Sequence, residues 1–524
     1  MNETENASSS EDQVAALDAR NLQKTPSFRI RTAAHKLMPW LIEHPFISEA
    51  RAYHKKRDPE ENERTAPPAD EFIDLRGLWV VEFYTPAHIE NLLSGFRRLG
   101  WDKDDDSIPR NNPLVWVQRL RENPYGGGWL NLGHIRPPGS RTFLTNFRSG
   151  PLPPEVEYAT GRLFSLTSSL TCIVMGFVFN AEYSRIFDSQ LRVDRETYLK
   201  RKGRGHQIFN PAAQKEDHIR LIRAEAGENA ASWFRKYIPG LFSSGILGGD
   251  FPTCEFVSLR ATEPFPARPA NSDRPPAYLS ILDMDDDWST WTCADMSGLK
   301  FTWPTTRGED SRYHAVLAVR EGDLAGNALK SWNVSDRSGQ INYLDHLITG
   351  LLSRWAILPM LTGYGRHLNA IRNSATLRSD PGHDPVEILR NLVDHVSYNV
   401  DVAAVTAELI PYANEPSLFD HEVETFRPSN AKRYGEADYT LAKGLRIQIG
   451  ERAVWLQKTD QSLRDHLTQY GTLLGATESI RVQRTLRRLT IVVIILTLLM
   501  LWAAMANSEL GLRLDQYFKA FSLR

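Results

Sequence analysis

The chain has 524 residues, enough for roughly two to four domains that each bury a sizeable core. Its formal net charge of −2 removes an overall electrostatic basis for nucleic-acid binding, and 41% hydrophobic residues with 13 Trp exclude a largely disordered chain. The three cysteines, Cys172, Cys254 and Cys293, are widely separated and odd in number, so they indicate neither a disulfide framework nor a CxxC metal knuckle. A reducing compartment such as the cytosol fits this pattern.

Residues 1–70 are predicted to be a disordered or loosely ordered N-terminal region and linker. The first 26 or so residues are polar and rich in Ser and Glu, without the basic and apolar regions of a signal peptide. A short helix interrupted by Pro39 and Pro45 is expected over residues 28–50. The charged stretch 54–70 indicates a linker or an exposed loop.

Residues 71–325 are predicted to form an α+β domain, with two packed subdomains as one arrangement. Its first unit is a buried strand at Leu78–Tyr84, then Thr85 and Pro86 as a helix start, then a helix that Gly100 ends. Further strands are expected at residues 114–118, 129–135, 142–147, 254–259, 277–282, 300–303 and 315–319, and helices at residues 180–199 and 216–237.

The stretch 163–179 has two readings. Its 17 residues carry no charge and end in TCIVMGFVF, so a second membrane span is one of them. Five hydroxyl side chains weaken its apolar character, and its β-branched end is typical of a buried strand. The balance favours a core element.

Residues 340–488 are predicted to form a helical domain or stalk. An apolar helix is expected at residues 344–358, with Pro359 as a break, and a capping pattern at residues 384–387 predicts a helix over 385–410. Residues 437–488 are expected to form one long helix that leads into the next segment. An approximate heptad rhythm favours packing against its own domain, with a short oligomeric stalk as the alternative; its members are Leu456, Leu463, Leu467, Tyr470 and Leu474.

Residues 489–506, LTIVVIILTLLMLWAAMA, are predicted to be a single transmembrane helix. Their 18 residues give roughly 27 Å of helix, enough to cross the hydrocarbon core of a bilayer. A buried helix of a soluble core is the alternative. The polar tail 507–524 is expected to form a short amphipathic helix on the membrane surface or to be a disordered translocated end.

Membrane-interface residues are predicted at both ends of this run. Trp502 lies near its far end, where an indole ring favours the water interface, and four arginines precede it: Arg481, Arg484, Arg487 and Arg488. By the positive-inside tendency the arginines stay cytosolic, which places the N-terminal body in the cytoplasm and makes the chain single-pass and tail-anchored. The expected partners are the lipid bilayer, through 489–506, and anionic lipid headgroups.

The segment 463–507, in which a long polar helix leads into RRLTIVVIILTLLMLWAAMAN, resembles the junction between the stalk and the first membrane helix of CorA-type magnesium transporters. Those transporters carry a Gly-Met-Asn signature followed by a second membrane helix. This chain has Met505-Ala506-Asn507 and then a polar tail. The resemblance covers less than a tenth of the chain, and magnesium transport does not follow from it.

An acidic cluster follows the strand expected at residues 277–282, and it is the candidate metal site: Asp283, Asp285, Asp286 and Asp287. Carboxylates at the end of a strand can converge on Mg²⁺ or Ca²⁺, whereas the plain alternative is a solvated turn. The sequence contains no HEXXH, GxSxG or P-loop pattern, so the catalytic residues, the cofactor and the status as an enzyme are all left open.

These features favour a membrane-anchored cytosolic interaction, scaffold or sensor protein, with a protein partner or a homo-oligomer as further expected associations. Two other classes are kept as alternatives. One is a membrane-tethered enzyme, for example a metal-dependent hydrolase that uses the acidic cluster. The other is an oligomeric channel or transporter component, since one helix cannot enclose a pore.

Overall fold

The computed structural model describes residues 26–38, 45–102, 112–122, 127–139, 147–202, 205–245, 247, 251–267, 275–303, 314–377, 400–430, 438–506 and 509–522. The chain divides into two compact units. The first, here called the sheet unit, comprises Met1–Tyr364 and Ala404–Val454, and the second, the helical unit, comprises Gly365–Ala403 and Trp455–Arg524. The tail 1–25 and the capping pattern 384–387 lie outside the described residues.

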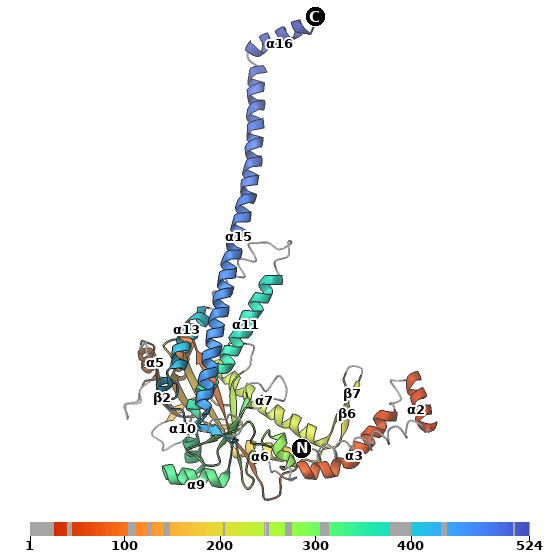
Figure 1. Ribbon diagram of the computed structural model, residues 1–524, viewed down its shortest axis with the longest axis vertical. Helices are drawn as coiled ribbons and strands as arrows, with labels where there is room; N and C mark the ends of the chain where they lie inside the picture. The colour runs from red at the N-terminus through yellow and green to blue at the C-terminus, as the bar shows by residue number, and fades with distance from the viewer. Residues whose placement is uncertain are drawn as a thin grey trace. The chain divides into compact units, whose positions relative to one another are not determined.

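A large mixed sheet organises the sheet unit (Figure 1). Among the described residues ten strands form it, in the order β12-β9-β10-β11-β8-β1-β5-β4-β2-β3, and neighbours are antiparallel except for the β8–β11 and β2–β3 pairs. Its strands are β1 (Ile73–Tyr84), β2 (Gly128–Arg136), β3 (Phe147–Ser149), β4 (Val156–Ser165), β5 (Thr171–Phe179), β8 (Thr253–Leu259), β9 (Trp291–Cys293), β10 (Lys300–Thr302), β11 (His314–Arg320) and β12 (Phe426–Pro428). A separate hairpin joins β6 (Tyr198–Lys202) and β7 (Gly205–Phe209).

The described helices fall into three groups. Those wholly within the sheet unit are α2 (Pro26–Leu37), α3 (Pro45–Thr65), α4 (Ile89–Leu99), α5 (Pro113–Arg121), α6 (Ala181–Arg192), α7 (Pro211–Tyr237), α8 (Ala277–Ile281), α9 (Glu321–Trp332), α10 (Arg337–Trp355) and α14 (Pro416–Phe419). Three have residues in both units: α11 (Ile357–Leu377), α13 (Val400–Asn414) and α15 (Leu441–Ala506). The last, α16 (Glu509–Phe521), belongs to the helical unit.

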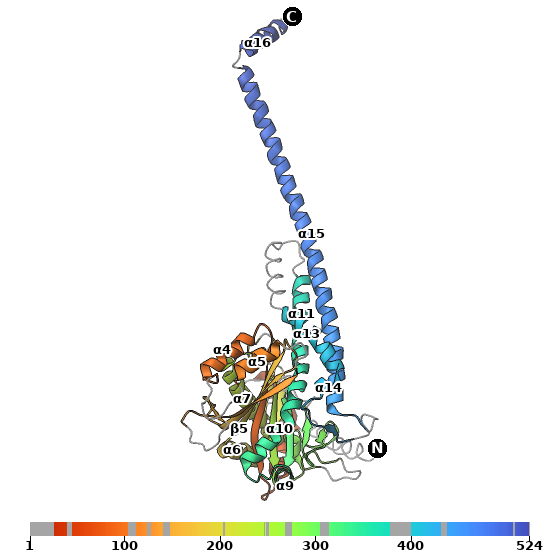
Figure 2. The ribbon, with the colours of Figure 1, turned by 90° about the vertical axis from the view of Figure 1, so that its left-hand side faces the viewer.

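Helices cover both faces of the central strands, which explains why β1 and β5 are buried along their whole length. On one face Leu78 and Val80 belong to the same apolar core as Phe96 of α4 and Phe234 of α7. Trp79 points to the opposite face, because side chains alternate along a strand, and its indole Nε1 donates to Asp345 of α10 at 2.9 Å. Figure 2 shows α10 beside the sheet and α4 next to α5.

The stretch 163–179 is a core element, as the balance of its side chains predicted. It contains the end of β4, the turn and all of β5, and Leu163 and Ile173 are completely buried. The hydroxyl groups that weakened its apolar character have a structural use. Ser168 and Ser169 in the turn donate to the carboxylate of Glu408 on α13 at 2.8 and 2.7 Å.

Two expectations about the local structure of residues 54–118 were wrong. Residues 114–118, expected as a strand, lie in α5, where Pro113 occupies the first turn and the side chain of Asn112 accepts the Leu114 N–H at 3.0 Å. The stretch 54–70, expected as a loop, largely belongs to α3. The ammonium group of Lys215 on α7 donates to the Asn62 carbonyl and the Thr65 hydroxyl near the end of α3, at 3.3 and 3.0 Å, so this helix is tied to the body.

The long helix expected over residues 437–488 is confirmed. It is the first part of α15, which continues without a break to Ala506. The break between α10 and α11 lies at Ala356, three residues before the expected Pro359, and that proline occupies the first turn of α11, where its missing N–H costs nothing.

Gly350 of α10 provides a test of how closely the chain packs around this helix. A Cβ atom at Gly350 would overlap the carbonyl oxygen of Glu422. We expect Gly350→Ala to lower the free energy of unfolding by about 3 kcal/mol or more, because backbone rather than a flexible side chain would have to move. Denaturant unfolding of the full chain in detergent, followed by tryptophan fluorescence, measures this.

Gly326→Ala in α9 is the matched control. No atom lies within 4 Å of a Cβ there, so alanine should leave stability unchanged or raise it by up to about 1 kcal/mol through its helix propensity. If the two alanine variants unfold at the same denaturant concentration, the close contact between Gly350 and Glu422 is contradicted.

Candidate functional site

The predicted metal cluster follows a helix rather than a strand. Residues 277–281 form α8, with Pro276 as its N-cap residue, so the expectation of a strand there was wrong. Asp283 has a left-handed backbone with φ of 59°, and its carboxylate binds the guanidinium of Arg223 at 2.9 Å. Asp286 accepts the backbone N–H of Trp288 at 2.9 Å.

The four aspartates are not assembled as a metal site in the described structure. Among the described residues, no group of three or more His, Cys, Asp or Glu side chains is placed to hold a metal ion. Asp283 already has a cation as its partner. Asp285, Asp286 and Asp287 continue the chain as a partly exposed segment.

Asp283 belongs instead to a buried charge network centred on Arg223 of α7. The guanidinium donates to both carboxylate oxygens of Glu255 on β8, at 2.6 and 2.9 Å, and to the Leu282 carbonyl at 2.9 Å. His314, at the start of β11, lies with its Nε2 atom 3.3 Å from the same carboxylate. The network therefore joins α7 and the end of α8 to two neighbouring strands of the sheet.

The electrostatics of Glu255 follow from these contacts. Its side chain is only 1% exposed, and burial alone would raise the carboxyl pKa. Arg223 and then His314 outweigh this effect and lower the pKa to about 2. Glu255 is thus a carboxylate at all physiological pH values, bound to a cation, and its arrangement is suited to holding the fold together rather than to moving a proton.

Removing Arg223 should expose the cost of burying Glu255. We expect Arg223→Met to lower the free energy of unfolding by about 3–5 kcal/mol, since it leaves a buried carboxylate without its cation. The exposed pair Arg220–Asp217, also on α7, gives the control: Arg220→Met should cost at most about 0.5 kcal/mol. Equal effects of the two substitutions would contradict the role given to Arg223.

The same network predicts that the folded chain becomes less stable at acid pH. The Glu255 pKa is lower in the folded chain than in the unfolded chain, so its stabilising contribution is complete above about pH 4.5 and is lost as the pH falls toward 2. In Arg223→Met the carboxylate has lost its cation. The free energy of unfolding of this variant should therefore fall less than that of the wild type between pH 4.5 and 2, or not fall at all. Unfolding measured at several pH values compares the two proteins.

A second cluster of titratable groups was not predicted from the sequence. Glu424 and Asp295 share a side-chain hydrogen bond, and His346 of α10 has its Nε2 atom 3.7 Å from Glu424. The Trp332 ring lies 5.6 Å from the His346 ring, between centroids. Backbone pairing creates this proximity, because Ala294 donates to the Thr425 carbonyl at 2.8 Å and β12 pairs with β9.

This second cluster can hold a proton near neutral pH. Burial, and then the neighbouring Asp295, raise the pKa of Glu424 to about 7. Burial, and then the charge of Arg162, lower the pKa of His346, which leaves the imidazole mostly neutral. A Glu424 carboxyl group that titrates near neutral pH, beside a mostly neutral imidazole, can exchange a proton with solvent.

Glu82 is a third buried carboxyl group, and its partners are structural. It is completely buried on β1 and accepts the backbone N–H groups of Phe242 and Ser243, at 2.8 and 2.9 Å. Burial raises its pKa to about 7. Its contacts fix the segment that follows α7. A lone glutamate inside the apolar run LWVVEFY, like Glu255 inside TCEFVSL, is the sequence signal that could have revealed these buried groups.

The cysteines do not form a thiolate site. All three are free thiols and buried. Burial raises the pKa values of Cys172 and Cys254 well above the ordinary range and that of Cys293 to about 12. Each thiol therefore stays protonated at neutral pH, and a thiol is a weak nucleophile in that form.

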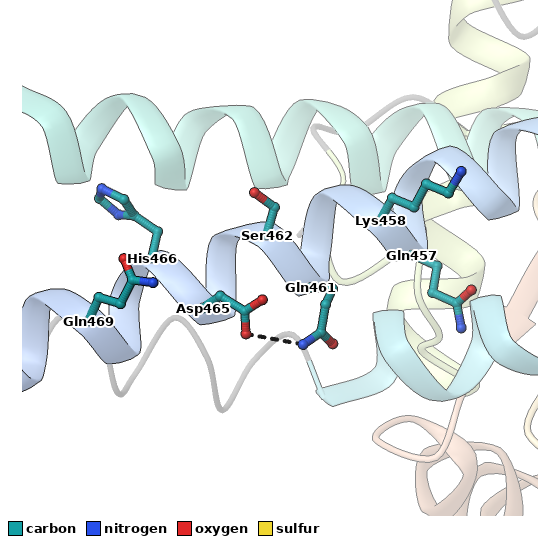
Figure 3. Close-up of a pocket in the computed structure, with 7 residues that line it drawn as sticks. All are labelled: Gln457, Lys458, Gln461, Ser462, Asp465, His466 and Gln469. Carbon is teal, nitrogen blue, oxygen red and sulfur yellow. Dashed lines mark hydrogen bonds between the residues drawn. The ribbon is translucent and has the colours of Figure 1, made fainter.

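An open hollow runs along α15 within the helical unit (Figure 3). Its lining comes from one helix alone and is polar, and Figure 3 shows these side chains spread along the helix rather than converging on one point. A hydrogen bond of 3.1 Å joins Gln461 to Asp465. The lining residues are Gln457, Lys458, Gln461, Ser462, Asp465, His466 and Gln469.

The predicted transmembrane run lies at the end of α15. Among the described residues one helical segment is long and apolar enough to cross a membrane, Ser479–Met505, and none of its apolar window is buried by protein. Its 27 residues correspond to roughly 40 Å of helix, which matches a bilayer with its headgroup regions. The apolar part is the predicted run, and its large side chains are 44–70% exposed on all sides of the helix.

The polar atoms of this run are satisfied inside the helix. The Thr490 hydroxyl donates to the Leu486 carbonyl at 2.8 Å, and the Thr497 hydroxyl donates to the Val493 carbonyl at 2.7 Å. The backbone groups bond along the helix. A segment in hydrocarbon needs such internal partners, because an unsatisfied polar group there costs several kcal/mol.

The predicted membrane-interface residues occupy the two ends of the segment. The four arginines lie in its first turns and are exposed, and Trp502 is 70% exposed near the other end. Arg481, Arg484 and Arg488 follow a spacing of three and four residues, so they share one face of the helix. A 30 Å hydrocarbon core centred on the predicted run 489–506 would have Arg487 and Arg488 at about its edge and Arg481 and Arg484 beyond it.

No protein-family model matches the chain, and no curated protein matches it either.

Proposed function

We propose that the protein is a membrane-anchored interaction, scaffold or sensor protein whose sheet unit is held in the cytosol by the helix Ser479–Met505. The observation that carries the proposal is the contrast between the two apolar regions of the chain. The sheet covers its apolar side chains with helices on both faces, whereas the run 489–505 leaves thirteen large apolar side chains uncovered. A bilayer is the medium that covers a helix on every side.

The orientation is proposed from charge. Four arginines precede the apolar run, and three cationic residues, Arg513, Lys519 and Arg524, follow it. The excess of positive charge on the N-terminal side favours retention of that side in the cytosol. The rigid sheet unit, with buried arginines paired to carboxylates, would then present its outer surface to cytosolic partners at the membrane.

Fractionation of cells that express the full chain tests the anchor. The chain should stay in the membrane pellet through high salt and alkaline carbonate, because apolar burial does not depend on ionic strength. A chain that ends at Glu478 should move to the soluble fraction while keeping the unfolding transition of the sheet unit. Release of the full chain by salt would contradict an integral anchor.

The arginine face gives a separate test of headgroup binding. We expect Arg481→Gln with Arg484→Gln and Arg488→Gln to weaken binding to anionic lipids, since each arginine near an anionic surface contributes about 1 kcal/mol. Detergent-solubilised chain is mixed with nanodiscs that contain either phosphatidylcholine alone or phosphatidylcholine with phosphatidylserine, and the preference of the chain for the anionic discs is measured.

Arg452→Gln with Arg464→Gln and Lys458→Gln removes the same charge earlier on α15 and serves as the control. The control should keep the wild-type preference for anionic discs. If the two triple variants lose that preference equally, net charge rather than the arginine face accounts for it.

A further inference from the structure

The helix α16 carries an apolar face that no part of the described structure covers. Tyr517, Phe518 and Phe521 are 77%, 72% and 82% exposed, and Leu514 is 44% exposed. Their positions follow the spacing i, i+3, i+4 and i+7, so the four side chains lie on one side of the helix.

The other side of α16 is polar. Lys519 and Asp515 are one turn apart and form an exposed ion pair of 3.3 Å. Gln516 lies next to Lys519 around the helix, on the side away from Asp515. A helix with three large aromatic side chains on one side and an ion pair on the other is suited to a boundary between an apolar and an aqueous medium.

The covalent connection limits where this face can find its cover. The apolar helix α15 ends at Ala506 and α16 begins at Glu509. Three steps between Cα atoms span at most about 11 Å, so α16 must begin within that distance of the end of the membrane segment. If that segment spans a bilayer, the headgroup region is the surface that α16 meets first.

The length and charge of α16 exclude a second crossing. Its 13 residues give roughly 20 Å of helix, and a membrane-spanning helix needs about 30 Å. Charged side chains at Arg513, Asp515 and Lys519 also interrupt it, and each would cost several kcal/mol at the centre of a bilayer.

We infer that α16 lies flat on the membrane surface opposite the sheet unit, with Leu514, Tyr517, Phe518 and Phe521 in the boundary between headgroups and acyl chains. This inference rests on the proposed function, because it needs α15 to span the bilayer. A surface helix at the translocated end resists withdrawal of the span, since the charged side chains of α16 would have to cross the hydrocarbon.

Site-directed fluorescence tests the inference on the full chain in vesicles of phosphatidylcholine and phosphatidylserine. Three single variants, Phe518→Cys, Gln516→Cys and Ile494→Cys, are labelled with an environment-sensitive dye, and the buried native cysteines keep background labelling low. Phe518 and Gln516 lie on opposite sides of α16, so they form a matched pair. Aqueous iodide and lipids with a nitroxide near the headgroup are the two quenchers, and iodide is present on both sides of the vesicles.

The expected result is that the dye at position 518 is quenched several-fold more by the nitroxide lipid than by iodide, and that the order reverses at position 516. Equal quenching of both positions by iodide would overturn the inference. Protection of position 518 from both quenchers would also overturn it, because a second copy or another protein would then cover the face. The dye at position 494 tests the proposed transmembrane helix separately from the placement of α16. If lipid does not shield that position from iodide, the proposal that α15 spans the bilayer is contradicted.

Discussion

No protein in the part of the chain that the structure describes covers the apolar side chains of residues 489–505, and the interpretation of the whole chain depends on what does cover them. Thirteen large side chains of this run are 44–70% exposed. At about 1.5–3 kcal/mol for each large apolar side chain left in water, the cost is on the order of 20 kcal/mol or more. This free energy favours transfer of the run from water into an apolar medium. Lipid removes the cost without requiring any particular contact.

The sheet unit differs from this run, because it buries charged side chains inside protein. Glu255 keeps its charge because Arg223 binds both of its oxygens, and Asp345 receives hydrogen bonds from Trp79 and Thr160, with Arg162 at 3.4 Å. These groups lie between the sheet and the helices that cover it. Each pair fixes one helix against particular strands, since a shift would leave a buried charge without its partner. The pairs therefore fix the positions of the helices on the sheet, because apolar contacts alone would allow the helices to slide.

The sequence predicted the features that depend on long local patterns. The uninterrupted apolar run, the long helix before it and the buried strand at residues 171–179 all have strong periodicity or composition over many residues. Short apolar runs were less informative. Residues 114–118 and 277–282 were predicted to be strands, but Asn112 and Pro113 start a helix at the first, and Pro276 precedes a helix at the second. A run of five or six mainly apolar residues fits either structure, so the residues before each run decided the outcome.

The titratable clusters could not be predicted, because they depend on contacts between distant parts of the chain. The side chains of Glu424 and Asp295 are close together because β12 pairs with β9. The sequence around either residue does not indicate that pairing. The acidic run 283–287 was proposed as a metal site because of its composition. In the structure the Asp283 carboxylate forms an ion pair with Arg223 on α7. Glu82 and Glu255 can be recognised in the sequence as single acidic residues within apolar strands. The residues that bind their carboxylates cannot be recognised in this way.

Protease treatment of sealed membrane vesicles that expose their cytosolic face tests the central claim most directly. With an epitope at the C-terminus, the account predicts that the sheet unit is digested, and that a protected fragment begins close to Ser479 and retains the epitope until detergent opens the vesicles. Loss of the epitope in intact vesicles, or protection of the sheet unit, would contradict a chain that crosses the bilayer once with its body in the cytosol.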